Sequence, residues 1–414
     1  MDRWGIGDSL LKEAVLAEKA IEPEISAIEK RAAENSLKVL AGFRDAEIGE
    51  HHLQGSHGYG YHDSGREALE RLFAKIFGGE EAIVRPQLVS GTHALACALF
   101  GLLRPGDEVI TIPSVPYDTL HPIFGLRSST GSLPEWKIGV RGVELADVLA
   151  GKPVCKPETR VVFIQRSRGY AWKDAIPLGD IETCIKRLKA QSPKLLAVVD
   201  NCYGEFVKER EPCDIGADLA AGSLIKNPGG GMALTGAYLV GRSECIRQAA
   251  IEMTAPGLGK EIGPTLGLHR SFFLGLYLAP QLVGEAMKTA LFASQLFHQL
   301  GYEVSPAPKQ SRTDIIQGIK FGSREKLLAF AKGIQAAGPL NHKTVPIPAP
   351  MTGYEHEVVM AGGTFVQGGS LELSCDAPLR PPYVAYLQGG LSFTHGKLGV
   401  LLGAQVLLNA PKAL

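Results

Sequence analysis

The stretch Asp218-Leu-Ala-Ala-Gly-Ser-Leu-Ile-Lys-Asn-Pro-Gly-Gly-Gly231 places one lysine, Lys226, among small and apolar residues that end in a proline and three glycines. Burial in such surroundings disfavours an ammonium and lowers the pKa of a lysine. A neutral amine is the form that attacks carbonyl groups and makes Schiff bases. The alternative is an exposed lysine before a glycine turn, and this stretch alone leaves both interpretations open.

An apolar run that ends in an acid lies upstream of this lysine, at Leu195–Asp200. It predicts a buried parallel strand with Asp200 at its carboxyl end. Ligands of open α/β sheets bind at such ends. The run therefore favours a functional role for both Asp200 and Lys226.

Further upstream, the turn of Ser90, Gly91 and Thr92 leads directly into an apolar helical stretch. A turn of small residues at a helix N-terminus favours binding of an anion. A phosphate site, an acid and a lysine in this order are the arrangement expected for pyridoxal phosphate. The helix terminus takes the phosphate, Asp200 keeps the pyridine nitrogen protonated, and Lys226 forms the Schiff base.

Three segments, Ser90–Ala94, Val199–Phe206 and Gly222–Gly231, together resemble the fold-type I pyridoxal-phosphate enzymes of cysteine and methionine metabolism. More narrowly, they resemble the branch labelled methionine gamma-lyase family or aluminium resistance protein. The resemblance implies an aspartate-aminotransferase-like α/β fold, with a mainly parallel seven-stranded sheet in a large domain and a smaller α+β C-terminal domain. It also implies a carbon-sulfur lyase acting by β- or γ-elimination on an amino acid of the cystathionine, methionine or cysteine type.

The resemblance also assigns residues to the cofactor. Ser223, shortly before Lys226, is expected to bind it. Tyr59 falls where the family has a tyrosine that reaches the phosphate in a neighbouring subunit, which implies a homodimer or homotetramer with shared sites. The family motif is often Tyr-x-Arg, whereas this chain has Tyr59-Gly-Tyr61, so Arg66 is the candidate substitute for the missing arginine.

Tyr117 follows the strand expected at 108–112, in a loop rich in proline. A ring at this topological position can cover one face of the pyridine, and its hydroxyl can act as an acid or base. The alternative is a tyrosine that packs beneath the loop.

An amino-acid substrate needs a cation for its carboxylate, and arginine matches a carboxylate with two hydrogen bonds. The family usually places this arginine in a pattern near Arg-x-Ser-x-Gly, but the comparable stretch here, Gly369–Asp376, has none. We expect Arg380, in a loop stiffened by prolines, to take the role, with Arg312 and Arg168 as the next candidates. The alternative for Arg380 is an arginine that caps a surface loop. Arg168 could instead bind the phenolate oxygen of the cofactor or be an exposed arginine on a loop.

The chain has 414 residues, enough for two domains, and equal numbers (43 each) of basic and acidic side chains. The balance gives no field that favours nucleic acid, and no apolar run is long enough for a membrane helix. Seven scattered cysteines and an N-terminus without an apolar signal core predict a cytoplasmic protein. We expect an N-terminal helical arm at 1–48, a cofactor-binding domain at 49–290 and a small domain at 291–414.

Periodicity supports this division. It predicts two helices within 8–43 that break at Pro23, a long helix over 265–299, and helices over 323–337 and 391–408. Among the expected C-terminal strands are 314–321, 358–365 and 370–374.

Four histidines, His51, His52, His57 and His62, lie in a glycine-rich loop. Their spacing fits no compact zinc pattern, so no metal is expected, although a metal role is not excluded. Three alternatives stay open at this point. An aminotransferase or decarboxylase would share the cofactor residues, and a non-enzymatic metal-resistance protein is the alternative from another class. A structural or interaction protein is the third, and the agreement of three separate motifs disfavours it.

Overall fold

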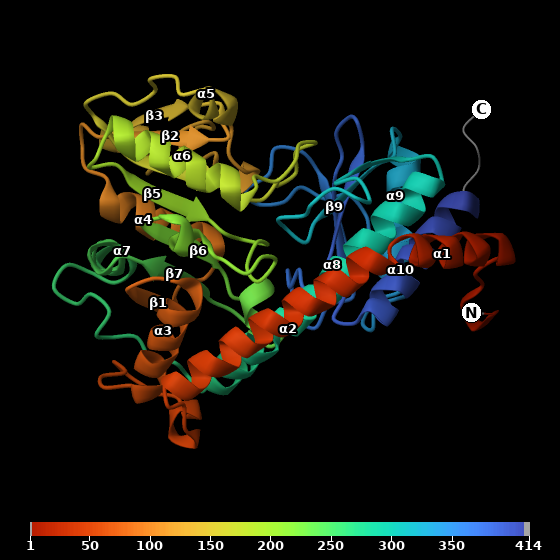
Figure 1. The fold of residues 1–414 in the computed structure, drawn as a ribbon, viewed down its shortest axis with the longest axis horizontal. Coiled ribbons are helices and arrows are strands. Elements are labelled where there is room, and N and C mark those ends of the chain that lie inside the picture. Colours follow the sequence, from red (N-terminus) through yellow and green to blue (C-terminus); the bar gives the residue numbers. More distant parts are fainter. Residues whose placement is uncertain (1, 410–414) are drawn as a thin grey trace.

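The computed structural model describes residues 2–409, so Met1 and 410–414, the outer ends of the expected arm and small domain, lie outside the described residues. A seven-stranded sheet in the order β1-β7-β6-β5-β4-β2-β3 forms the larger half of the molecule (Figure 1). Only β7 runs antiparallel to its neighbours, so the mainly parallel sheet is confirmed. Its strands are β1 (Glu81–Arg85), β2 (Glu108–Ile112), β3 (Gly139–Gly142), β4 (Thr159–Gln165), β5 (Leu196–Asp200), β6 (Leu219–Ser223) and β7 (Ala237–Gly241).

Helices cover both faces of this sheet. One face packs on α4 and α7, and the other on α3, α5 and α6, because successive side chains of a strand point to opposite faces. Val198 thus packs toward α4, whereas Val199 packs toward α6. These helices are α3 (Ser64–Phe77), α4 (Gly91–Leu102), α5 (Leu145–Leu149), α6 (Leu178–Gln191) and α7 (Ser243–Met253).

A five-stranded antiparallel sheet in the order β10-β11-β12-β9-β8 forms the smaller half. The strand expected at 370–374 is wrong: residues 370–373 turn, and the strand begins only at Ser374. Gly368, just before them, has a positive φ of 77°, so the chain bends there. The elements of this half are β8 (Glu303–Ser305), β9 (Gln317–Lys320), α9 (Arg324–Ala336), β10 (Val358–Ala361), β11 (Ser374–Pro378), β12 (Val384–Gln388) and α10 (Phe393–Asn409).

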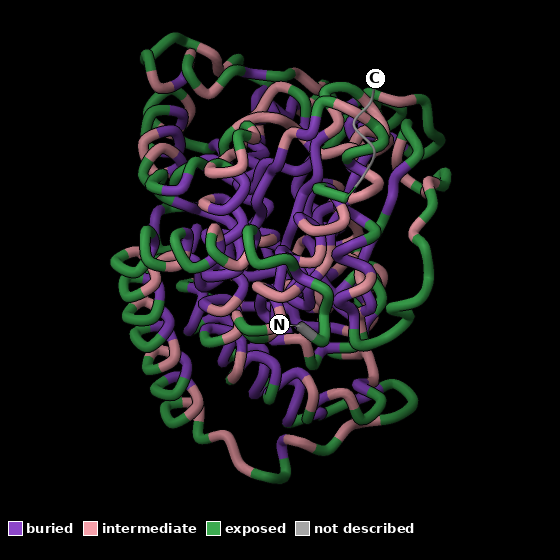
Figure 2. Tube along the Cα trace, turned by 90° about the vertical axis from the view of Figure 1, so that its right-hand side faces the viewer, coloured by how far each residue is buried: buried purple, intermediate pink, exposed green. Residues whose placement is uncertain are grey.

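Three helices tie the two halves together: α1 (Asp8–Ala20), α2 (Glu22–Asp45) and α8 (His269–Gln299). α2 lies along α8 across the molecule, and α1 continues toward α10 (Figure 1). Pro23 stands at the start of α2, where a missing backbone N–H costs nothing, and so separates α1 from α2 as expected. Buried residues run continuously through both halves, while the outer face of α2 stays exposed (Figure 2). Within 2–409, no helix is both long and apolar enough to cross a membrane.

Candidate functional site

A cavity of about 860 Å³ lies where the carboxyl ends of β5 and β6 and the N-terminus of α4 meet the small sheet. Seven of the residues singled out from the sequence line it together: Ser90, Gly91, Thr92, Tyr117, Asp200, Ser223 and Lys226. They come from four separate stretches of the chain, and only the fold makes them neighbours. A smaller hollow of about 420 Å³, at the opposite ends of β5 and β6, contains none of them.

The first turn of α4 forms one end of the cavity. Ser90 caps the helix, because its Oγ accepts a hydrogen bond of 3.1 Å from the backbone N–H of His93. The N–H groups of Gly91 and Thr92 have no acceptor among the described residues, as expected for the first positions of a helix. A side chain at Gly91 would stand 3.2 Å from Cys202 Sγ, so glycine keeps this end open. The turn is an anion site without an occupant from the chain itself.

Asp200 ends β5 and faces the same cavity. Its Oδ1 accepts a hydrogen bond of 3.1 Å from the N–H of Cys202, and no described residue donates to Oδ2. Burial raises the pKa of Asp200 above its ordinary value, although the hydrogen bond from Cys202 and the charge of Lys226 oppose this. A cation beside Oδ2 would restore the ionised form.

Lys226 follows β6 and points over the ring of Tyr203, with Nζ 3.7 Å from the ring centroid. Burial by itself lowers the pKa of this lysine. The neighbouring Tyr203, Cys202 and Asp200 favour the ammonium more strongly, so the pKa of Lys226 lies above its ordinary value. The expectation that burial leaves Lys226 as a neutral amine is therefore wrong, because the neighbouring side chains favour the ammonium.

These features fit pyridoxal phosphate. The free N–H groups of Gly91 and Thr92, with the hydroxyl of Ser223 at the end of β6, can hold a phosphate. The free oxygen of Asp200 can accept from a protonated pyridine nitrogen, and Lys226 can reach an aldehyde in the same cavity. Each end of the cavity thus offers the group that the corresponding part of the cofactor requires.

Tyr117 lines the cavity beside this set. Its backbone N–H donates to Gln165 Oε1 at 2.6 Å, and its hydroxyl is hydrogen-bonded to that of Tyr354. Its ring meets the edge of Tyr170, with the centroids 5.3 Å apart. Burial raises the pKa of Tyr117 well above its ordinary value, so the hydroxyl is protonated at neutral pH and can donate a proton.

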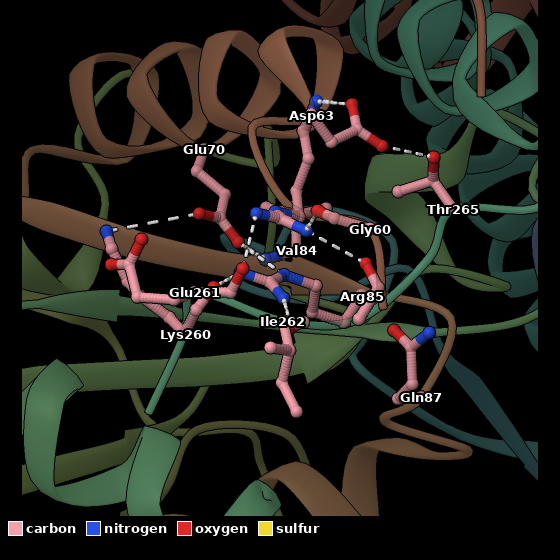
Figure 3. Close-up of polar contacts among 12 residues, drawn as sticks. Gly60, Asp63, Glu70, Val84, Arg85, Gln87, Lys260, Glu261, Ile262 and Thr265 are labelled. Atoms are coloured by element: carbon pink, nitrogen blue, oxygen red, sulfur yellow. Dashed lines mark hydrogen bonds and ion pairs between the residues drawn. The ribbon is translucent and has the colours of Figure 1, made fainter. Parts of the chain in front are cut away.

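Tyr59 lies outside the cavity and is 70% exposed; its neighbour Gly60 is drawn in Figure 3, close to Glu261 of a second loop. Arg66 donates to the carbonyls of Gly60 at 2.6 Å, Gly263 at 3.0 Å and Glu261 at 3.1 Å. The guanidinium of Arg66 thus holds the two loops together within the chain, and its role toward the phosphate of a neighbouring subunit stays a prediction.

None of the three arginines expected to bind the substrate lines the cavity. Arg168 is buried, and its Nη1 donates to the carbonyl of Ser305 at 2.8 Å. Arg312 donates to the carbonyl of Ala290 at 3.3 Å, and burial lowers its pKa to about 9. Neither guanidinium lines the cavity, although Nε and Nη2 of Arg168 and Nε and Nη1 of Arg312 are buried without a hydrogen-bond partner among the described residues.

Arg380 comes nearest to the cavity. It donates to the carbonyl of Tyr170, a lining residue, at 2.8 Å, and it lies 3.5 Å from Asp118. These contacts place the guanidinium at the rim, behind Tyr170, and not inside.

The wall that the small sheet contributes was missed. Asp376 and Gln388 line it from β11 and β12, and Tyr354 reaches it from the loop before β10. Asp376 ends the stretch Gly369–Asp376, in which the family pattern has an arginine. The sequence therefore shows an acid there but does not show that it faces the site. Tyr354 has no local pattern that could have identified it.

The four histidines do not gather. No group of three or more His, Cys, Asp or Glu side chains within 2–409 is arranged to hold a metal. Instead, His51 and His52 lie against each other, and His52 Nδ1 accepts from the N–H of Gly49 at 3.0 Å.

Known proteins match this chain over a range that includes every residue lining the cavity. The sequence profile of the family described as Methionine gamma-lyase matches residues 10–408. The uncharacterized protein YnbB of Bacillus subtilis is 45% identical over 410 residues, 97% of each chain. The crystal structure of a Clostridium novyi protein, described as a carbon-sulfur lyase involved in aluminum resistance, has a TM-score of 0.91 and 42% identity over 97% of each chain. A Clostridium acetobutylicum protein, provisionally described as a cystathionine beta-lyase involved in aluminum resistance, has a TM-score of 0.93 and 43% identity over 98% of this chain and 97% of its own.

Proposed function

Because the chain belongs to the methionine gamma-lyase family, whose cofactor is pyridoxal phosphate, we propose that it cleaves a carbon-sulfur bond at Cβ or Cγ of a sulfur-containing amino acid. One observation carries the proposal. The anion site at Gly91 and Thr92, the carboxylate of Asp200 and the amine of Lys226 line a single cavity that is large enough for a cofactor and a substrate together.

The bound cofactor supplies an electron sink that stabilises negative charge at the substrate Cα. Asp200, fixed by the N–H of Cys202, would hold the ring nitrogen of the cofactor protonated. Lys226, once its amine is free, removes the Cα proton and later returns one. The protonated hydroxyl of Tyr117 donates a proton to the departing sulfur, and Tyr354 orients it.

In the overall reaction the carbon-sulfur bond breaks, and the sulfur leaves as a thiol or, from cysteine or homocysteine, as hydrogen sulfide, which the assay below counts as the thiol product. Water then releases ammonia, and the carbon chain leaves as a 2-oxo acid. The carbon-sulfur lyase and cystathionine beta-lyase descriptions of the two clostridial proteins support a thioether amino acid as the substrate.

The assembly belongs to the same proposal. The exposed ring of Tyr59 lies on a loop fixed by Arg66, which supports a role for Tyr59 in the site of a second copy, most simply in a two-fold dimer. The seven cysteines are free, which supports the cytoplasmic location that we propose.

A product assay tests the activity. The enzyme loaded with pyridoxal phosphate is incubated with cysteine, cystathionine, homocysteine or methionine, and thiol, ammonia and 2-oxo acid are measured. We expect all three products from at least one of them without an added keto acid. Product formation that requires a keto-acid acceptor would instead identify an aminotransferase. The absence of a thiol from all four would contradict the proposal.

A further inference from the structure

The charges around the cavity are unusual for a site that takes amino acids. Of the described residues that line it, three carry a charge: Asp200, Lys226 and Asp376. The first two belong to the cofactor region. The wall opposite, built by the small sheet, therefore presents a single acid where a substrate carboxylate would require a cation.

Asp376 is held in one orientation. Its Oδ2 accepts hydrogen bonds from the hydroxyl of Tyr170 at 2.8 Å and from Nε2 of Gln388 at 2.7 Å. No donor in the described part of the chain reaches Oδ1. A carboxylate with one oxygen held and the other free is a prepared acceptor for a ligand that brings N–H donors.

Gln388 provides a second, independent acceptor. This side chain lines the cavity and is only 4% exposed. Its amide nitrogen donates a hydrogen bond to Asp376. Its amide oxygen, Oε1, accepts no hydrogen bond from any donor among residues 2–409. A buried acceptor without a donor costs about 1–3 kcal/mol. A ligand ammonium would remove this cost.

The aromatic rings of the cavity also favour a cation. The chain's own ammonium, on Lys226, lies 3.7 Å from the ring centroid of Tyr203. Burial raises the pKa of Asp376, whereas the hydrogen bonds from Tyr170 and Gln388 and the charge of Lys226 oppose this rise. Tyr170, one of these donors, stacks on Tyr354, so acid and rings share one wall. Aromatic faces attract ammonium groups, most strongly where water is excluded.

We propose that Asp376 selects substrates whose sulfur substituent carries a positive charge, with Gln388 as the second acceptor for that group. The inference rests on the proposed lyase function and gives it a substrate class: a thioether amino acid with a distal ammonium. A neutral substituent loses the ion pair, and an anionic one is repelled.

Three cysteine thioethers of similar length test this inference: S-(2-aminoethyl)-L-cysteine, S-propyl-L-cysteine and S-(2-carboxyethyl)-L-cysteine. The first two have the same shape and differ by one charge. We expect kcat/KM of the holoenzyme to be about ten- to hundred-fold higher for the aminoethyl than for the propyl compound, and lowest for the carboxyethyl compound. If the enzyme prefers γ-elimination, the homocysteine thioethers replace this set.

Asp376→Asn keeps an oxygen that can accept from Tyr170 and Gln388 but removes the charge. The ratio of kcat/KM for the aminoethyl compound to that for the propyl compound should fall to nearly one. Glu355→Gln is the matched control, because it removes an exposed acid next to Tyr354 that does not line the cavity, and it should keep the preference. Circular dichroism and thermal melting check that both variants fold.

The outcomes separate the two proposals. A wild-type preference near one, with good turnover of the propyl compound, overturns the role of Asp376 and leaves the lyase function intact. Tighter calorimetric binding of the aminoethyl compound without any thiol release overturns the lyase function and supports the cation site. An Asp376→Asn variant that folds and keeps the full preference also overturns the inference. If the enzyme neither binds nor converts any of the three compounds, both proposals are overturned.

Discussion

The two sides of the cavity differ in how their residues are placed. The cofactor side uses the carboxyl ends of β5 and β6, two neighbouring parallel strands, and the start of α4, which lies at the same edge of the sheet. The opposite side uses an antiparallel sheet and a long loop, which bring Asp376 and Tyr354 together from distant positions. The difference teaches that parallel-sheet topology fixes the cofactor side, whereas the substrate side depends on how two halves of the chain dock.

Lys226→Ala is the strongest test of the cofactor side. Loss of the amine removes both the attachment point and the proton carrier, so turnover should fall by at least about 10³-fold. Borohydride reduction and peptide mapping of the wild type should label Lys226. Lys173 is the matched control, because burial lowers its pKa to about 8 but it lies outside the cavity. Label on Lys173 would show that amine basicity, and not the cavity, selects the reactive lysine.

Asp200→Asn should lower kcat by roughly ten- to hundred-fold, the value of one charged hydrogen bond, and leave the fold intact. The asparagine oxygen can still accept from the N–H of Cys202. Asp218→Asn is the comparison, because this buried acid stands at the opposite end of β6 and bonds to the N–H of Ala197. It should reduce the melting temperature more than kcat. Equal kinetic effects of the two changes would make Asp200 a structural acid.

Tyr59 tests whether a third region, from a second copy, completes the cofactor side. A Tyr59→Ala chain and a Lys226→Ala chain, each inactive alone, should regain measurable activity when unfolded together and refolded as hybrids. Tyr61→Ala, which removes the neighbouring exposed ring, should need no such complementation. Full activity in a species that sediments as a monomer would contradict a shared site.

Arg380→Lys should have the smallest effect and sharpens the comparison on the substrate side. Its guanidinium is partly exposed and contacts Tyr170 and Asp118 at the rim, so we expect a loss of about 1 kcal/mol or less, up to about fivefold in kcat/KM. A loss of about a hundredfold confined to KM would instead restore Arg380 as the carboxylate site. Arg312→Lys, at a buried position, should mainly lower the melting temperature.

Much of the cofactor side could be predicted, because its signals are local. An apolar strand that ends in an acid, a small-residue turn before a helix, and a lysine before a glycine turn each occupy a few consecutive residues, and all three line the cavity. The pKa of Lys226 could not be predicted in the same way. It depends on Tyr203 and Asp200, which approach Lys226 only after the sheet has formed.

The predicted substrate arginines show where local reasoning fails. Arg168 and Arg312 are good candidates by residue type, but both are buried and neither lines the cavity. Their partners, Ser305 for Arg168 and Ala290 for Arg312, are distant in the chain, so the local sequence did not specify these contacts.

The sequence by itself determined the family, the fold class and the cofactor, because these rest on short motifs and on hydrophobic periodicity, which act between near neighbours in the chain. Only the tertiary structure decided that the acid at Asp376, and no arginine, faces Lys226 across the cavity. The physical reason is that this contact joins β11 to the end of β6, more than a hundred residues away, through the docking of two separate sheets. A charge pattern between such elements exists only once both are folded and packed.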